Sequence, residues 1–323
     1  ETAAAARTHP SSRAHTAPSP ISSQASMGSW PVVLLLLALL AAATPLAAVA
    51  LLLLLIRLRR TCSPARSVAF FHPYAECGGG GERVLYLCVM AIQKMNPDLP
   101  IIIYSGASDK SGDDIIADAQ RRFQIGQFPR RQSITFVSLR LRFLLEPWMY
   151  PRFTLLGQSL GSMIVTIEAL LQTVPAIFID TTGFAFSYPL AHAAGCEVMC
   201  YTHYPTVSTD MISVVESGKV AFNNSKSVAT MSSLRRIKVL YYRLFAQIYG
   251  WAGRYSSLIF VNSTWTYSHI RDLWGVAERT HILFPPCATQ HLQEFPVESE
   301  RESLVLSLGQ FRPEKNHQLQ LRS

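Results

Sequence analysis

The chain has 323 residues, of which 49% are hydrophobic, and it carries a formal net charge of +8 at pH 7. This length allows one large or two ordinary domains, and the positive charge favours a phosphate-bearing partner such as a nucleotide, a lipid head group or nucleic acid. The six cysteines show no framework spacing, which excludes a small disulfide-stapled protein and is typical of reduced core residues in a cytosol-facing domain.

The N-terminal region combines a polar segment with a long apolar run. Residues 1–30 are rich in Ala, Ser, Thr and Pro, which predicts a disordered segment. Residues 31–56 contain no charged side chain, so this run can cross a bilayer of about 30 Å as one helix, despite Pro45. A cleaved signal peptide is the alternative, but its apolar core is usually about 7–15 residues long and follows basic residues. Here the arginines come after the run, which predicts a single-pass anchor with its C-terminal side in the cytosol.

The next feature is a glycine-rich turn. The apolar run Val68–Phe71 predicts a buried strand, and the apolar spacing in Gly80–Met95 predicts a helix, so the four glycines Gly78–Gly81 occupy a strand-to-helix turn. Such a turn lets a ligand approach the backbone, and the free N–H groups of the helix start can bind an anion such as a diphosphate. An ordinary tight turn is the alternative. The spacing matches neither the dinucleotide fingerprint nor the P-loop, which disfavours those two sites.

Beyond this turn, short apolar runs alternate with helical patterns. This alternation predicts parallel βαβ units, with helices on both faces of a doubly wound sheet, over residues 67–289. A polar linker is expected at 290–302. A further domain is expected to begin within 303–323, with its first strand at Leu304–Leu308. The predicted strands after the first are Leu99–Tyr104, Ile134–Leu139, Ala176–Ile179, Val198–Tyr201, Leu258–Val261 and His281–Phe284.

Two places in this arrangement favour ligand binding. His203 follows the predicted strand Val198–Tyr201, and ligands of doubly wound sheets bind outside the carboxyl ends of the strands. Arg312 and Lys315 follow the final predicted strand, where the fork of an arginine and the point charge of a lysine suit a diphosphate. A structural histidine and a solvated turn are the respective alternatives.

Two further patterns resemble known sites. Gly157–Gly161 matches the G-x-S-x-G motif of α/β-hydrolases around Ser159, but its surroundings favour one long helix over the strand that a nucleophile elbow needs. Cys196, Cys200 and His203 invite a zinc site, but their spacing does not fit paired ligands, so core cysteines and no metal are expected.

Basic and aromatic residues mix in a third region. No acidic residue occurs between Glu216 and Asp272, whereas eight lysines and arginines do, and the segment Leu240–Trp251 adds aromatic residues at helical spacing. Such a helix can lie on an anionic bilayer surface. A core helix with a solvated basic face is equally compatible. No recognised motif supports nucleic-acid binding.

Taken together, these motifs resemble the GDP-mannose-dependent α-1,2-mannosyltransferases of the dolichol pathway, which belong to the retaining glycosyltransferase family 4. The resemblance covers Ser67 to His317. It is carried by Phe70–Val84, Phe153–Ser162, Tyr201–Met211 and Gly309–His317.

The resemblance implies a GT-B fold with two Rossmann-like domains, an N-terminal acceptor domain and a C-terminal donor domain that is only begun here. It implies transfer of mannose from GDP-mannose, as donor substrate without a cofactor or metal, to Man3GlcNAc2-PP-dolichol during assembly of the lipid-linked oligosaccharide for protein N-glycosylation. By the same resemblance, Gly80 and Gly81 approach the donor, His203 contacts the donor sugar as the catalytic residue, and Arg312 and Lys315 bind the leaving diphosphate. The implied surroundings are the cytosolic face of the endoplasmic reticulum membrane, with other mannosyltransferases of the pathway as partners.

The chain departs from the family where the nucleotide pocket and an E-x7-E motif are expected, because it ends before either. We therefore expect a truncated form with little activity alone. A non-catalytic membrane protein that binds lipid-linked oligosaccharide or partner enzymes is the alternative, and a hydrolase using Ser159 is a remote one. The sequons Asn223–Ser225 and Asn262–Thr264 are expected to stay unglycosylated if the body faces the cytosol.

Overall fold

The computed structural model describes residues 30–107, 109–218 and 231–287, and then 289, 293–294, 296, 298, 302–309, 311 and 315–322. The chain divides into two units, with the boundary after Ala50. The predictions for residues 1–29 and for the sequon at Asn223 lie outside the described residues.

Helix α1 (Trp30–Cys62) contains the apolar run and continues through Pro45. Its C-terminal part belongs to the second unit, where Ile56 is buried in the core. Arg57 and Arg59 donate side-chain hydrogen bonds to the carbonyls of Ala193 and Leu171. The helix is thus confirmed, whereas its passage through a bilayer stays a prediction. Within the described residues, the helix that is long and apolar enough to span a membrane is Thr154–Gln172.

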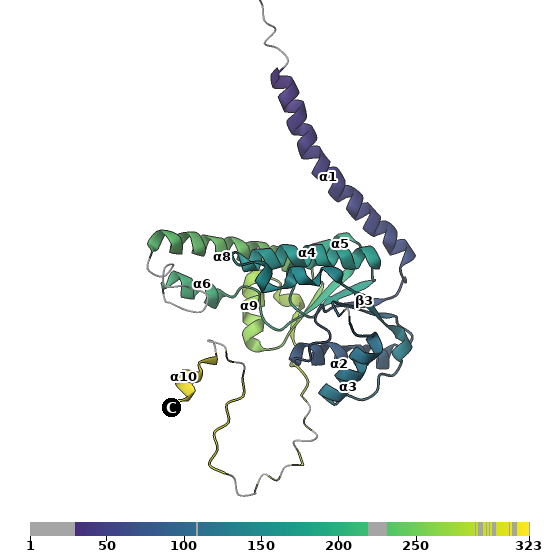
Figure 1. The fold of residues 1–323 in the computed structure, drawn as a ribbon, viewed down its shortest axis with the longest axis vertical. Coiled ribbons are helices and arrows are strands. Elements are labelled where there is room, and N and C mark those ends of the chain that lie inside the picture. The colour runs from purple at the N-terminus through teal and green to yellow at the C-terminus, as the bar shows by residue number, and fades with distance from the viewer. Residues whose placement is uncertain are drawn as a thin grey trace, which may run out of the picture. The chain divides into compact units, whose positions relative to one another are not determined.

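The second unit is built on a seven-stranded sheet whose neighbouring strands all run parallel, in the order β3-β2-β1-β4-β5-β6-β7 (Figure 1). This confirms the predicted α/β class and places seven predicted strands within a few residues of their observed bounds. They are β1 (Val68–Phe71), β2 (Ile101–Ser105), β3 (Ile134–Ser138), β4 (Ile177–Asp180), β5 (Glu197–Thr202), β6 (Leu258–Val261) and β7 (Thr280–Ile282).

Helices cover both faces of this sheet, as Figure 1 shows. Helices α2 and α3 pack over one face, and α4, α5 and α8 over the other. The α-helices of the second unit after α1 are α2 (Gly80–Met95), α3 (Gly112–Phe123), α4 (Thr154–Gln172), α5 (Tyr188–Ala193), α6 (Thr209–Glu216), α8 (Ser232–Gly253), α9 (Thr264–Trp274) and α10 (His317–Gln320). The 3-10 helices are η1 (Arg131–Ser133), η2 (Arg140–Leu145), η3 (Pro147–Met149), η4 (Ala185–Ser187) and η5 (Ala277–Arg279).

The central strands are apolar without alternation because both of their faces are covered. Every residue of β1 and β2 is buried. Phe70 points into the cluster under α2 and α3, and Phe71 into the cluster under α4 and α8. Burial on two faces is the condition under which parallel strands become continuous hydrophobic runs. Because β1, β4 and β5 are neighbours and run parallel, their carboxyl ends lie side by side at one edge of the sheet.

The predicted strand at Leu304–Leu308 is wrong. This segment has no strand geometry, and the side chains of Val305 and Leu308 are 96% and 95% exposed. A parallel strand is stabilised by hydrogen bonds to a neighbour, and no other described strand runs beside this segment.

Candidate functional site

The glycine turn leads from β1 into α2 at the carboxyl edge of the sheet. Gly78 has a φ of +81°, which an L side chain rarely adopts, and a Cβ there would collide with the Arg122 guanidinium. Gly80 and Gly81 form the start of α2, where the first N–H groups have no partner within the helix. A Cβ at Gly80 would meet nothing within 4 Å, so the backbone is open to a ligand there.

His203 follows β5 and reaches the same place. A Cβ on Gly81 would lie 3.4 Å from His203 Nε2 and 3.8 Å from His72 Cε1. The structure therefore brings together the three sequence-predicted residues Gly80, Gly81 and His203. They lie in one small region although they are separated by more than 100 residues of chain.

The surroundings of His203 favour its neutral form. Burial lowers its pKa, and the nearby His72 lowers it further, against the opposing charge of Glu82. Its ring packs on Tyr201 with 4.8 Å between the centroids, and the Tyr201 hydroxyl is fixed by the Leu283 carbonyl at 2.7 Å. The Nε2 atom is buried and has no hydrogen-bond partner among the described residues. A buried ring nitrogen without a partner is suited to a hydrogen bond with a ligand.

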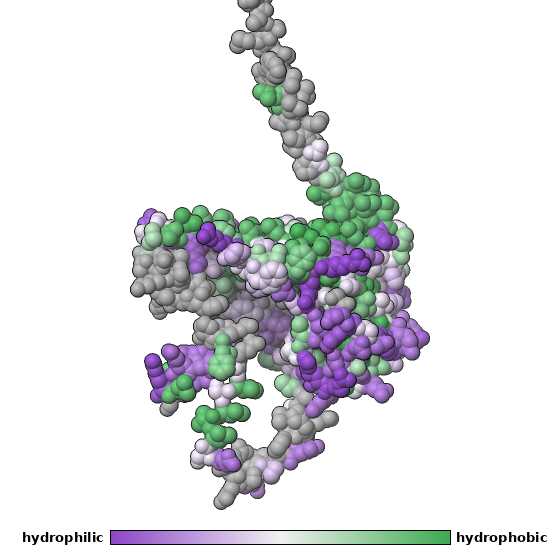
Figure 2. Space-filling model, in the orientation of Figure 1, coloured by the Kyte–Doolittle hydropathy of each residue, from purple (hydrophilic) through white to green (hydrophobic). Residues whose placement is uncertain are grey.

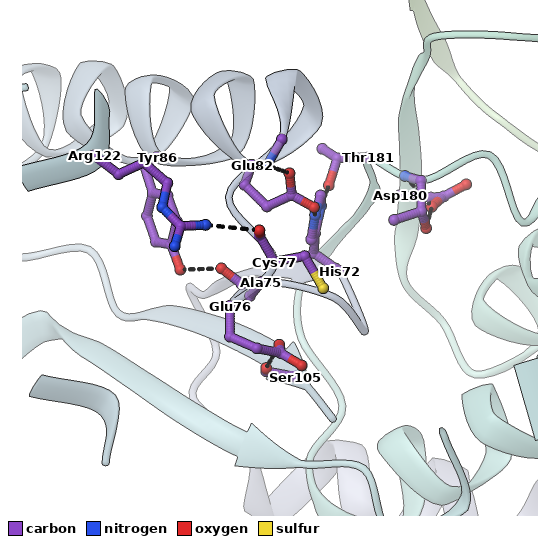
Figure 3. Close-up of polar contacts among 12 residues, drawn as sticks. His72, Ala75, Glu76, Cys77, Glu82, Tyr86, Ser105, Arg122, Asp180 and Thr181 are labelled. Atoms are coloured by element: carbon purple, nitrogen blue, oxygen red, sulfur yellow. Dashed lines mark hydrogen bonds and ion pairs between the residues drawn. The ribbon is translucent and has the colours of Figure 1, made fainter. Parts of the chain in front are cut away.

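A buried chain of hydrogen bonds, which the sequence prediction missed, holds the glycine turn in place (Figure 3). Glu82 accepts the Gly79 N–H at 2.5 Å through one carboxylate oxygen and lies 3.3 Å from His72 Nε2 through the other. His72 Nδ1 lies 2.7 Å from the Thr181 hydroxyl. Burial opposes ionisation of Glu82, but the hydrogen bonds from His72 and the backbone lower its pKa overall. The signal available in the sequence was a glutamate three residues after the helix cap.

A second buried carboxylate fixes the loop after β4. Asp180 accepts the backbone N–H groups of Thr182 and Gly183, the Thr182 hydroxyl and the Tyr188 hydroxyl, at 2.8–3.2 Å. Burial raises the pKa of Asp180, although these hydrogen bonds oppose the rise. These hydrogen bonds fix the course of the loop that carries Thr181, where it meets His72.

Two arginines of the basic stretch between Asp118 and Glu146 brace the turn. Arg122 donates to the Cys77 carbonyl at 2.8 Å, and Arg142 pairs with Glu76 at 2.6 Å (Figure 3 shows Arg122, Cys77 and Glu76). These two cations therefore bind protein groups and support the glycine turn.

The predicted diphosphate pair is only partly described. Arg312 lies outside the described residues. Lys315 is exposed, its carbonyl accepts a hydrogen bond from the Gln320 side chain at 3.1 Å, and its side chain approaches Gly309. These contacts stay within the C-terminal segment, so the binding of a diphosphate by Lys315 stays a prediction.

The hydrolase interpretation of Ser159 is wrong. Ser159 lies inside α4, it is 5% exposed, and its hydroxyl donates to the Leu155 carbonyl at 2.7 Å. The flanking glycines have a packing role, because a Cβ on Gly161 would collide with the Leu144 carbonyl. Among the described residues, no group of three or more potential metal ligands occurs. Cys196 and Cys200 are buried in the core.

Comparisons with known proteins show which family this chain resembles. Residues 65–274 match the family model described as "ALG11 mannosyltransferase N-terminus". A Xenopus laevis protein named GDP-Man:Man(3)GlcNAc(2)-PP-Dol alpha-1,2-mannosyltransferase is 48% identical over 79% of this chain and 53% of its own length. Human and Caenorhabditis elegans proteins of the same name are 46% and 42% identical, over 79% and 80% of this chain and 52% and 55% of theirs.

The chain thus spans about half the length of the curated relatives it matches. Among solved structures, a UGT transferase from Siraitia grosvenorii in complex with UDP is 11% identical over 68% of this chain and 50% of its own, with a TM-score of 0.35.

Proposed function

The chain belongs to the ALG11 mannosyltransferase N-terminus family, and on that premise we propose that it forms the acceptor-side domain of a retaining GT-B α-1,2-mannosyltransferase. The donor is GDP-mannose and the acceptor is Man3GlcNAc2-PP-dolichol, as the names of the relatives indicate. The observation that carries the proposal is the meeting of His203 with Gly81 at the carboxyl edge of the sheet.

The proposed chemistry follows from where charge develops. As the bond between mannose and diphosphate breaks, negative charge grows on the leaving diphosphate, and groups already in place for that charge lower the barrier. The N–H groups of Gly80 and Gly81 supply partial positive charge at the start of α2. We assign the neutral His203 to a hydroxyl of the donor mannose, and Arg312 and Lys315 to the diphosphate. This chemistry needs no metal ion or cofactor.

We further propose that the α4 and α8 side of the body rests on the cytosolic leaflet of the endoplasmic reticulum membrane. Figure 2 shows apolar residues gathered along this side. Helix α8 buries Tyr242 and Tyr249 in the core and still exposes large apolar side chains elsewhere, which a helix with only a solvated basic face would not do. The exposed set consists of Leu156, Leu160, Ile164 and Leu171 on α4 and Leu234, Ile237, Leu240, Leu244, Ile248 and Trp251 on α8.

Cations accompany the apolar residues of this side. Arg235, Arg236 and Arg243 line one hollow on α8 together with Leu240. Helix α8 contains Arg235, Arg236, Lys238 and Arg243 and no acidic residue, and Arg243 pairs with Glu216 of α6 at 2.7 Å. Apolar side chains with flanking cations fit a bilayer that contains anionic lipids. The α1 run at 31–56 would then anchor the protein beside its lipid-linked acceptor, in reach of other mannosyltransferases of the pathway.

Transfer activity is tested with a chimera in which residues 65–274 of this chain replace the matching segment of the frog relative. We expect this chimera to transfer mannose from GDP-mannose to the lipid-linked acceptor. His203→Ala should lower the rate by about 10²–10³-fold, because one group that stabilises the transition state is lost. His192→Ala is the matched control, since His192 lies within the exchanged segment and is exposed on α5. An active chimera that is indifferent to His203→Ala would refute the assigned role.

The membrane surface is tested by binding to phosphatidylcholine vesicles with and without phosphatidylinositol. The double variant Ile237→Ser, Ile248→Ser should bind at least ~10-fold more weakly, because burying each such side chain contributes about 1.5–3 kcal/mol. Met95→Ser, which removes an exposed apolar side chain from α2, should bind as the parent does. Equal losses in both variants would contradict a surface centred on α8.

A further inference from the structure

A cavity of about 230 Å³ opens at the carboxyl ends of β4 and β5, beside the first half of α4. This volume equals that of roughly seven or eight water molecules at about 30 Å³ each, which suits a single ring-sized ligand. None of its lining side chains is charged. Its polar lining comes from three parts of the chain: Gln158, Ser159 and Ser162 of α4, Thr182 and Gly183 after β4, and Tyr204 and Thr206 after β5.

Most polar hydrogens around this cavity are already committed. The hydroxyls of Ser159 and Thr206 donate to main-chain carbonyls at 2.7 and 3.3 Å, and that of Thr182 donates to Asp180 at 2.8 Å. The Gln158 amide donates to a carbonyl at 2.6 Å. What these groups still offer is the lone pairs of their oxygens. The cavity therefore favours a ligand that brings its own donors and disfavours an anion, which needs donors or cations.

Aromatic rings supply the remaining lining. Phe184, Phe186 and Tyr204 all contribute, and Tyr204 stacks on Trp265 with 5.0 Å between ring centroids and 27° between planes. Tyr204 is 57% exposed, so its ring is available at the surface. Uncharged hydroxyl acceptors beside aromatic rings suit a molecule with hydroxyl groups around its edge and an apolar ring face, which is the character of a neutral pyranose.

The cavity adjoins the site of the glycine turn. Thr181 contacts His72 at 2.7 Å, and the next residue, Thr182, lines the cavity. His203 meets Gly81, and the next residue, Tyr204, also lines the cavity. We propose that this cavity binds one neutral pyranose unit of the acceptor glycan, next to the point of transfer. This inference rests on the proposed function, since it names the part of the acceptor that the same edge of the sheet holds.

The test measures binding of lipid-free Man3GlcNAc2 to the chain in detergent by ligand-observed NMR, with inorganic phosphate as the anionic probe. Tyr204→Ala and Thr206→Val should each weaken glycan binding by about 5-fold or more, which corresponds to one hydrogen bond or ring contact. Tyr204→Phe should retain binding because it keeps the ring. Thr135→Val, on the exposed side of β3, is the matched control. Unchanged glycan binding by Tyr204→Ala and Thr206→Val would overturn the inference, as would competition of phosphate for the cavity.

The same variants in the active chimera separate this inference from the proposed function. We expect a raised KM for the lipid-linked acceptor and an unchanged KM for GDP-mannose. Transfer with normal acceptor KM in both variants would reject the cavity and leave the transferase intact. Glycan binding that depends on Tyr204, in a chimera that transfers no mannose, would support the cavity and reject the transferase. The thermal unfolding midpoint of each variant reports whether it is folded.

Discussion

The loops after β1 and β4 lie next to each other, since Phe71 is in register with Asp180, and each is built around a buried carboxylate. After β4, Asp180 is surrounded by neutral donors from its own loop and from Tyr188. After β1, Glu82 accepts the backbone N–H of Gly79 and contacts the ring of His72, while the N–H groups of Gly80 and Gly81 have no partner within α2. Only the loop after β1 therefore keeps donors for a ligand.

This difference separates a loop whose donors are used within the protein from a loop whose donors remain for a ligand. Asp180 accepts the hydrogens of Thr182 and Gly183, so their loop offers a ligand only the lone pairs of its oxygens. Glu82 and His72 hold the glycine turn in place through hydrogen bonds. On its other side, the turn faces His203 Nε2, which has no partner in the described part of the chain. Buried polar groups without partners are rare, and they concentrate where a ligand completes them. Three predictions test this contrast.

The largest effect is expected from Asp180→Ala. The substitution leaves donors from Thr182, Gly183 and Tyr188 without an acceptor inside the protein, so the free energy of unfolding should fall by at least about 3 kcal/mol. Chemical denaturation followed by circular dichroism measures this loss. Tyr188→Phe removes one of these hydrogen bonds and should cost only about 1 kcal/mol. If Asp180→Ala lowered the free energy of unfolding by less than about 1 kcal/mol, water would have replaced the carboxylate, and the two loops would then be alike.

A smaller effect, on activity instead of folding, is expected from Gly81→Ala. Alanine favours a helix over glycine by about 1 kcal/mol, so stability should hold or rise. The new Cβ would lie 3.4 Å from His203 Nε2, within the space assigned to the ligand. Transfer by the chimera should therefore fall by about 10- to 100-fold. Gly126→Ala is the control, because its Cβ would have only a distant contact with Met90. Destabilisation by Gly81→Ala would instead place this glycine among the structural ones.

Much of this arrangement follows from the sequence by general rules. Apolar runs of the right length predict the strands, and parallel strands bring their carboxyl ends together, which is why His203 and Gly81 could be predicted to lie near each other. The order of the elements, βαβ throughout, was sufficient to predict a doubly wound sheet. These are properties of the local pattern and of sheet topology.

Other parts depend on contacts that no local pattern specifies. His72 is held by Thr181, which is 109 residues away, and the identity of that partner requires the register between β1 and β4. The motif around Ser159 misleads for the same reason, because its glycines serve contacts with Leu144 and Tyr150 across the helix surface. Leu304–Leu308 has the composition of a strand, but composition cannot supply the neighbouring strand that a sheet needs.

The smallest effect is a difference in pH dependence between the two carboxylates. The folded pKa of Glu82 lies below the ordinary value of 4.5, so its ionised form stabilises the fold above that pH, and the contribution is lost as the pH falls through the lowered folded pKa. The folded pKa of Asp180 lies above the ordinary value of 3.8, because burial disfavours the charge. Its ionisation therefore costs stability as the pH rises from 3.8 through the raised folded pKa.

The two neutral variants Glu82→Gln and Asp180→Asn should consequently show opposite trends against the parent chain. On acidification, the stability advantage of the parent should shrink relative to Glu82→Gln and grow relative to Asp180→Asn. Each slope is limited to about 1.4 kcal/mol per pH unit, since one proton is involved. Urea unfolding at a series of pH values across this acid range measures both trends. Slopes of the same sign would mean that the His72 contact does not govern Glu82, and the distinction between the two loops would have to rest on the open glycine backbone alone.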